Sequence, residues 1–139
     1  SLSADGKTML YSSETGPRVM QYDLEGDKQL PDFQTFGQGE GMVLAQTYRP
    51  DGTILMLKAV GRTDFLLQHL TADADVIKEW PMPSPGWAIL SPSLDDNVML
   101  IGNFFSGTIA KFDLDKGEIT DEVQVGVERS LAGIAQYPG

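Results

Sequence analysis

The tetrapeptide Ala4-Asp5-Gly6-Lys7 returns later in the chain as Pro50-Asp51-Gly52-Thr53 and, in weaker form, as Leu94-Asp95-Asp96-Asn97. The Asp residues of these three copies are 46 and 44 residues apart. A repeat of this length is a signature of repeat architectures, in which each copy is one supersecondary unit. The sequence therefore predicts three copies of one structural unit.

Two further markers recur with the same spacing. A leucine follows each of these Asp residues by 19 positions, at Leu24, Leu70 and Leu114. A glycine opens an apolar run three times, at Gly41, Gly86 and Gly133. Three independent markers with one period make a chance repeat improbable, so we expect the units to share one fold.

Short β-rich runs alternate with turns rich in Gly, Asp, Pro and Asn, which predicts about four strands in each unit. In the first unit we expect strands at residues 8–13 and 19–24 and a ragged edge at 33–36. In the middle unit we expect strands at residues 42–48, 53–59, 64–70 and 76–80. In the third unit we expect strands at residues 87–91, 98–102, 108–113 and 119–125.

These features predict an all-β protein, a β-propeller with three four-stranded blades per chain. The blades would cover about residues 1–37, 38–82 and 83–127. The innermost strand of the first blade is missing on its N-terminal side, and we expect residues 131–137 to supply it. Helical repeats are excluded because five prolines between Pro50 and Pro92 and fifteen glycines in the chain would break them.

Three blades are too few to close a ring, since propellers use roughly four to eight. Left open, the first and last blades would expose apolar faces and an unpaired strand edge. Two solutions remain open at this stage. Either two copies associate head to tail to give a six-bladed ring, with residues 131–137 of each completing the first blade of the other, or a longer chain supplies the missing blades.

The chain is strongly acidic, with 20 Asp and Glu against 10 Lys and Arg and a net charge of −10. Such a charge repels phosphate backbones and anionic lipid surfaces, so we expect neither nucleic acid nor a membrane as a partner. The chain has no Cys and a single His, which excludes thiolate chemistry and His-pair metal motifs. We expect a soluble domain, cytoplasmic or exported.

Parts of the repeat resemble a known superfamily. The first unit has the sequence LSADGKTMLYSSET at residues 2–15 and RVMQYDL at 18–24, and the third has GTIAKFD at 107–113. These stretches resemble six-bladed propellers of the superfamily that contains gluconolactonase/SMP-30 proteins, strictosidine-synthase-like proteins and streptogramin lyases. The resemblance covers the whole chain, but its motifs are generic to propeller blades.

The resemblance implies a site for a divalent cation, often calcium, on the central axis. In lactonases of this superfamily the ligands come just before the glycines that open the innermost strands. The matching positions here are Glu40, Pro85 and Ala132, of which only Glu40 can ligate a metal. The resemblance therefore implies Glu40 as metal ligand and catalytic residue, although one such side chain per copy is a poor cage.

Five other residues are candidates for ligand binding. Glu14 and Asn103 occupy matching turns between strands, and Arg129 precedes the last predicted strand, where it could face the channel mouth and attract an anion. Phe104 and Phe105 are adjacent at a turn and cannot both point into one core face, so we expect one of them at a ligand mouth or an oligomer junction. The alternative for each of the five is an ordinary turn residue.

Two functions from different classes follow from these observations. The first is a module that binds a small-molecule ligand or a protein at its channel mouth or rim, which rests on the fold alone. The second is a lactonase-like hydrolase or a lyase, with Glu40 as metal ligand or general base. A base would need a second group to hold the electrophile, and the sequence identifies none.

Overall fold

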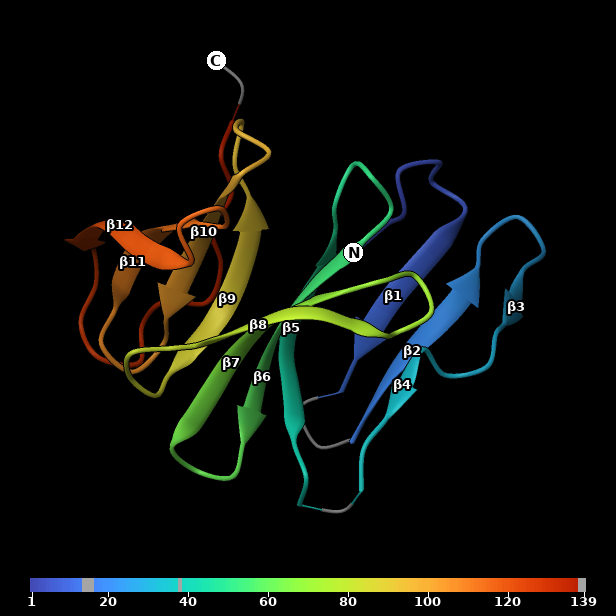
Figure 1. Cartoon of the computed structure of the whole chain (residues 1–139), viewed down its shortest axis with the longest axis horizontal. Helices are drawn as coiled ribbons and strands as arrows, with labels where there is room; N and C mark the ends of the chain where they lie inside the picture. Colours follow the sequence, from blue (N-terminus) through green and yellow to red (C-terminus); the bar gives the residue numbers. More distant parts are fainter. Residues whose placement is uncertain (14–16, 38, 138–139) are drawn as a thin grey trace.

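The structure, a computed structural model, describes residues 1–13, 17–37 and 39–137. The described residues form twelve β-strands and no helix, so none of them belongs to a helix that could span a membrane. The strands are arranged in three four-stranded antiparallel sheets that follow one another along the chain. Figure 1 shows the three sheets side by side in chain order. The prediction of an all-β chain with three four-stranded units is thus confirmed.

The first sheet consists of β1 (Thr8–Ser12), β2 (Arg18–Asp23), β3 (Lys28–Gln29) and β4 (Gln34–Thr35). The short strands β3 and β4 both pair with β2, at its two ends. They lie on either side of Pro31, which has no N–H to donate to the ladder and is therefore tolerated only at a sheet edge. The outer edge of this sheet is ragged, as the sequence predicts.

The second and third sheets are regular. The second consists of β5 (Met42–Tyr48), β6 (Ile54–Val60), β7 (Asp64–Leu70) and β8 (Val76–Pro81). The third consists of β9 (Trp87–Pro92), β10 (Val98–Asn103), β11 (Thr108–Asp113) and β12 (Glu118–Gln124). In both sheets each strand pairs with the next strand along the chain, so the sheets are simple meanders.

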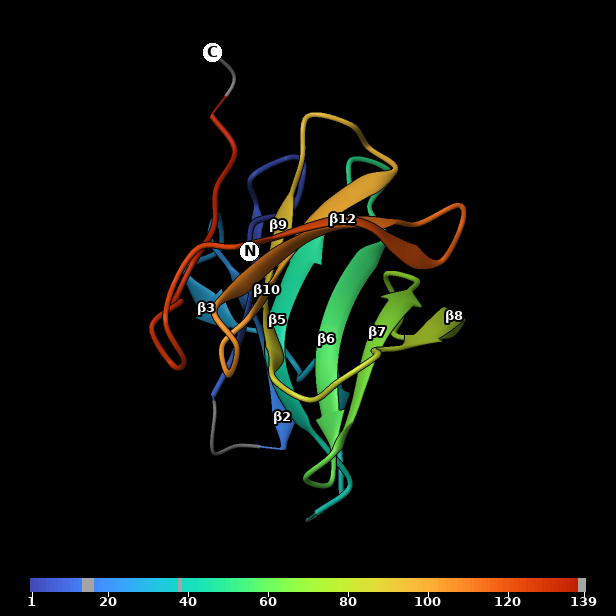
Figure 2. The ribbon, with the colours of Figure 1, turned by 90° about the vertical axis from the view of Figure 1, so that its left-hand side faces the viewer.

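The second sheet lies between the other two, and its strand β6 is buried on both faces. Figure 2 shows the third sheet in front of the second, with the two sheets turned face to face. Strand β6 has almost no polar residue because both of its faces are covered: Leu55 and Leu57 pack in a cluster with the third sheet, while Ile54 and Met56 pack in a cluster with the first. Burial of these side chains from both sides drives the stacking of the sheets.

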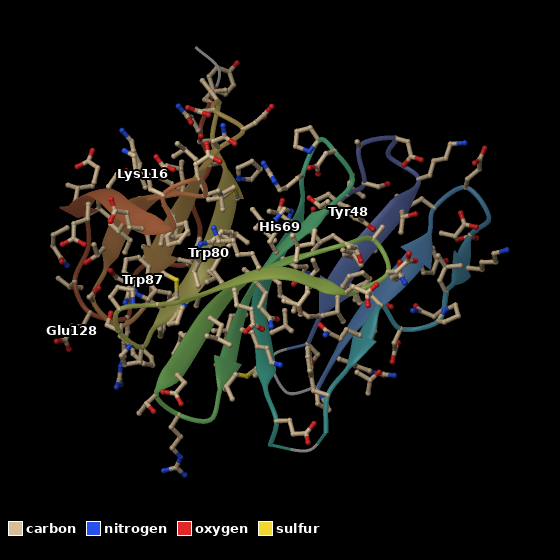
Figure 3. All side chains as sticks on the ribbon, viewed as in Figure 1. Tyr48, His69, Trp80, Trp87, Lys116 and Glu128 are labelled. Carbon is tan, nitrogen blue, oxygen red and sulfur yellow. The ribbon has the colours of Figure 1, made fainter. Side chains whose placement is uncertain are left out.

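The two tryptophans, Trp80 and Trp87, lie between the second and third sheets (Figure 3). Trp80 of β8 meets Phe112 of β11 edge to face, with ring centroids 5.6 Å apart. Trp87 of β9 is buried, and its indole N–H donates to the Ser84 hydroxyl at 3.2 Å. Aromatic pairs of this geometry add to the stability that their buried area provides.

One marker of the sequence repeat does not keep its register in the structure. Met9, Ile54 and Met99 are equivalent, because they pair with Leu2, Tyr48 and Pro92 of the preceding segments. Their partners on the next strand are Tyr22, Leu70 and Phe112. Leu70 is therefore equivalent to Tyr22 and Phe112 rather than to Leu24 and Leu114.

The cause is a difference in the lengths of two segments. Leu70 follows Ile54 by 16 residues, whereas Tyr22 follows Met9 by 13 and Phe112 follows Met99 by 13, so the β6–β7 hairpin is three residues longer than its counterparts.

The turn between β5 and β6 is one residue shorter, which leaves a net shift of two residues. Arg49 N–H donates to the Thr53 carbonyl at 2.8 Å, whereas in the first unit Ser3 N–H donates to the Thr8 carbonyl at 2.9 Å. A shift of one residue would turn every side chain of a strand to the opposite face. The net shift here is two residues, which leaves the faces of the strand unchanged.

The inner edge of the first sheet is only partly covered within one chain. Among the described residues no strand precedes β1, as expected, but Leu2 bridges to Met9 and Ser1 exchanges backbone hydrogen bonds of 2.9 and 2.8 Å with Leu10. Residues 131–137 form no strand within the chain. Their pairing with the first sheet of another copy stays a prediction.

Candidate binding site

A groove of about 560 Å³ lies at the end of the second and third sheets where strands β5 and β9 begin. Its wall is mostly apolar and includes Met42, Leu44, Phe65, Phe104, Phe105 and Leu131. The side chains come from both sheets, from the loop between β10 and β11, and from the segment after β12. The groove is therefore a product of the packing of the sheets.

Gly86 forms part of this wall, and its position demands glycine. The residue has φ of +101°, a conformation that side chains with a Cβ rarely adopt. A Cβ there would also collide with the Asn103 amide oxygen and approach the Phe105 ring to 2.9 Å. The glycine that opens the innermost strand thus allows the Phe104–Phe105 loop to lie against the start of β9.

Asn103 is buried and holds the loop in place. Its amide nitrogen donates to the Pro85 carbonyl at 3.0 Å, and its amide oxygen accepts from the Phe105 and Ser106 N–H groups at 3.0 and 3.1 Å. The Asn103 amide was predicted to contact a ligand, but in the structure it forms hydrogen bonds to the backbone. Asn103 acts on a ligand only through the loop that it positions.

The two phenylalanines remain accessible to solvent. Phe104 is 38% exposed and Phe105 is 48% exposed, and their ring centroids are 6.1 Å apart. The backbone of this loop is held by two hydrogen bonds. Phe104 N–H donates to the Gly86 carbonyl and Gly107 N–H donates to the Asn103 carbonyl, both at 2.9 Å. Exposed aromatic rings on such a constrained loop form a preorganised apolar surface.

Arg129 is joined to the same loop. Its N–H donates to the Phe104 carbonyl at 2.9 Å, and its backbone has φ of +59°. The side chain is exposed and forms no ion pair with any residue that the structure describes. The structure thus brings together four of the predicted residues, which are Asn103, Phe104, Phe105 and Arg129. Glu14 lies outside the described residues.

Glu40 lies in the turn before β5, and its carboxylate closes that turn. One carboxylate oxygen accepts from Gly37 N–H at 2.8 Å, while Glu40 N–H donates to the Gly37 carbonyl at 3.0 Å. Nearby, Lys58 lies 4.0 Å above the Phe36 ring, and burial lowers its pKa against the opposing effect of Glu79 and Glu40. Glu40 is exposed, and its contacts are those of a turn residue.

The described residues do not fit the divalent cation that the resemblance implies. Pro85 and Ala132 have no side-chain oxygen, and the Pro85 carbonyl already accepts from Asn103. Across the described ranges, no group of three or more His, Cys, Asp and Glu side chains could hold a metal ion. A hard cation needs about six to eight oxygen ligands, so the described part of one chain does not assemble the site.

His69 lies near the end of β7 that is opposite to the groove, and its ring contacts a polar network. Its ring Nε2 is 2.7 Å from the Thr53 hydroxyl, and Asp51 accepts from Thr53 N–H and hydroxyl at 2.9 and 2.6 Å. Burial lowers the pKa of His69, Arg49 lowers it further, and Asp51 opposes both. These contacts join the His69 ring to the turn between β5 and β6 and indicate a structural role.

Sequence reasoning missed the residues from other segments that complete the groove. Met42, Leu44 and Phe65 look like core residues in sequence, and Leu131 was assigned to a strand. The only signal was positional: Met42 and Trp87 both follow a glycine that opens an innermost strand, so the residues around them must meet at one end of the sheets. No pattern marked Phe65, whose exposure to the groove depends on how the sheets pack.

Comparisons with known proteins support the fold. No protein-family model and no curated protein matches the sequence. Among solved structures, 372 chains match the fold. One of them, from a structure described as "Crystal Structure of Mitotic Checkpoint Complex", has a TM-score of 0.68 at 13% sequence identity and covers 92% of this chain.

This likeness shows the fold alone, and the chain spans 36% of the length of that neighbour. Together with the three four-stranded antiparallel sheets, it shows a β-propeller fold in which each sheet is one blade. It does not identify the superfamily that the sequence resembles. The first, second and third sheets are hereafter called the first, second and third blades.

Proposed function

We propose that the chain is a protein-binding β-propeller module that receives an apolar side chain of its partner in the groove beside Phe104 and Phe105. The observation that carries this proposal is the exposure of both rings on a loop fixed by a buried asparagine. A flexible loop would lose entropy on binding, whereas this loop is already ordered. The arrangement has the features of a binding hot spot.

The general properties of the fold agree with a protein partner. The solved neighbour comes from a structure described as a complex, which is a precedent for such a chain within a protein assembly. The backbone of Arg129 is bonded to the loop and its side chain is exposed, so its guanidinium would favour a carboxylate next to the apolar anchor. The preferred ligand is thus a peptide segment with an aromatic or aliphatic side chain followed or preceded by an acidic residue.

The proposal also includes a closed six-bladed ring of the kind found in the gluconolactonase/SMP-30 superfamily. The ring would be completed either by a second copy of the chain or by blades of a longer chain. All of the residues that line the groove between the second and third blades come from one chain, so the groove forms without either route.

Selection from a random-sequence peptide library, followed by titration calorimetry, tests the binding proposal. We expect selected peptides to contain an apolar anchor, and Phe105→Ala to weaken them by about 30-fold or more, the loss of about 2 kcal/mol that defines a hot spot. Ile77→Ala is the matched control, because Ile77 is 51% exposed on β8, away from the groove. Equal binding by wild type and Phe105→Ala would refute the assignment of the site.

A further inference from the structure

The innermost strands of the second and third blades each contain a β-bulge. In β5 the pairing with β6 skips Leu44, and in β9 the pairing with β10 skips Ala88. A bulge inserts one extra residue into a strand and redirects a side chain, and bulges are common next to active sites. Leu44 and Ala88 both line the groove, so the two bulges bear directly on the candidate site.

The two bulges occupy equivalent positions in their blades. Tyr48 and Pro92 are equivalent residues of β5 and β9, and the bulged residue comes four positions before each of them. A regular strand alternates its side chains between two faces, and an extra residue interrupts this alternation. The backbone therefore directs Leu44 and Ala88 to the groove in the same way, and only their side chains differ.

The difference between these side chains is one of size. Leu44 brings a branched side chain to the wall formed by the second blade, and it also packs against the buried cluster between the second and third blades. Ala88 brings a single methyl group to the wall formed by the third blade. The third-blade wall is therefore recessed at Ala88, where its counterpart in the second blade fills the space.

Aromatic side chains share the groove with Ala88. The Phe105 ring lies against the start of β9, since a Cβ on Gly86 would come within 2.9 Å of it. Phe65 and Met42 also line the groove. Aromatic rings pair favourably with the edges and faces of other rings, and methionine sulfur contacts ring edges favourably. The chemistry of the wall thus favours a ring over an aliphatic side chain.

We propose that Ala88 determines the specificity of the groove, because its small side chain leaves room for the aromatic ring of a partner. This inference rests on the proposed function and commits it to one class of ligand, a peptide segment with a Phe, Tyr or Trp anchor. The groove of about 560 Å³ lies within the range of about 300–1,000 Å³ that is typical of ligand pockets. An anchor ring that pairs with Phe105 gains about three- to tenfold in affinity over an aliphatic side chain of equal area.

Substitution of Ala88 and of the anchor together tests this specificity. The probe is the tightest peptide that the wild type selects from the random-sequence library, with further versions whose anchor is Phe, Leu or Val. We expect the wild type to bind the aromatic versions about three- to tenfold more tightly than the leucine version. Ala88→Leu fills the recess, so it should weaken the aromatic versions by about tenfold or more and the valine version by less than about threefold.

Two variants serve as matched controls. Ala88→Ser keeps the side chain small, so it should keep the preference for an aromatic anchor. Ala72→Leu adds the same apolar side chain at an exposed position in the turn between β7 and β8, at the end of the second blade opposite to the groove, and it should bind as the wild type does. The series of anchors on the wild type needs no variant, so it decides the question even where Ala88→Leu does not fold.

A titration with p-cresol, which is the side chain of tyrosine without its backbone, requires no peptide. We expect p-cresol to shift the ring NMR signals of Phe105 in the wild type and in Ala88→Ser, and to leave them unshifted in Ala88→Leu. Equal shifts in all three proteins would overturn the inference, as would selected peptides with aliphatic anchors or an unchanged preference in Ala88→Leu. Those results leave the groove as a binding site, whereas peptides that bind equally well to Phe105→Ala would refute the proposed function itself.

Discussion

The contrast between Gly86 and Gly52 allows one stability prediction to be worked out from the structure. Both residues have positive φ, of +101° and +84°, but their surroundings differ. At Gly52 a Cβ would have no atom within 4 Å, while at Gly86 it would meet the Asn103 amide and the Phe105 ring. Alanine at the two positions therefore separates backbone strain from collision.

The expected losses can be estimated from these two causes. Left-handed backbone costs an alanine about 1–2 kcal/mol, which is the whole effect expected for Gly52→Ala. Forcing an extra carbon into a filled site adds about 1–3 kcal/mol, so Gly86→Ala should lose about 2–5 kcal/mol. Because the Asn103 amide and the Phe105 ring must move to admit the Cβ, Gly86→Ala should also weaken peptide binding in the groove.

Urea denaturation followed by circular dichroism measures the difference. We expect both variants to keep the slope of the wild type and to shift only the midpoint, with the larger shift in Gly86→Ala. Peptide affinity should fall in Gly86→Ala and stay at the wild-type value in Gly52→Ala. Equal destabilisation of the two variants would show that the Phe104–Phe105 loop yields to the new Cβ, and would refute the rigid loop on which the binding site depends.

Two further predictions concern polar residues. Asn103→Ala removes three hydrogen bonds from a buried site, so we expect a loss of about 2–4 kcal/mol in urea denaturation and a fall in peptide affinity; unchanged affinity would show that the amide does not position Phe105. Burial lowers the pKa of His69 below its ordinary value of 6.5, so the unfolded chain binds the proton more readily and the contribution of His69 to stability is complete above pH 6.5. This contribution should be lost as the pH falls through the lowered pKa, and His69→Gln should flatten that part of the pH dependence of the urea midpoint; an unchanged profile would contradict the burial of the ring.

Strand positions could be predicted because they depend on local chemistry. The Asp-Gly turns at Asp5 and Asp51 and the alternation of apolar residues placed ten of the strands within one residue of their observed ends. The same local reasoning failed at Leu70, because the β6–β7 hairpin is three residues longer, and the turn before β6 one residue shorter, than their counterparts. Asp5, Asp51 and Asp95 keep a nearly constant spacing, so aligning the three units on these residues does not reveal a change in the length of a hairpin.

The candidate site was only partly predictable. Adjacent phenylalanines at a turn are a local feature, so the sequence could single out Phe104 and Phe105; both rings are exposed, and their role in binding stays a prediction. The side chains of Glu40 and Asn103 are polar in any conformation, but their partners depend on the backbone that surrounds them. In the structure these partners are the backbone groups of Gly37, Pro85, Phe105 and Ser106.

The sequence by itself determined that this protein is a series of small β-sheets, because turn residues and apolar alternation act over a few neighbouring positions. Only the tertiary structure decided which faces of the sheets are covered, that Phe65 and Leu131 share a groove with the Phe104–Phe105 loop, and that Val123 is left exposed. These properties arise from contacts between residues far apart in the chain, and such contacts leave no local pattern.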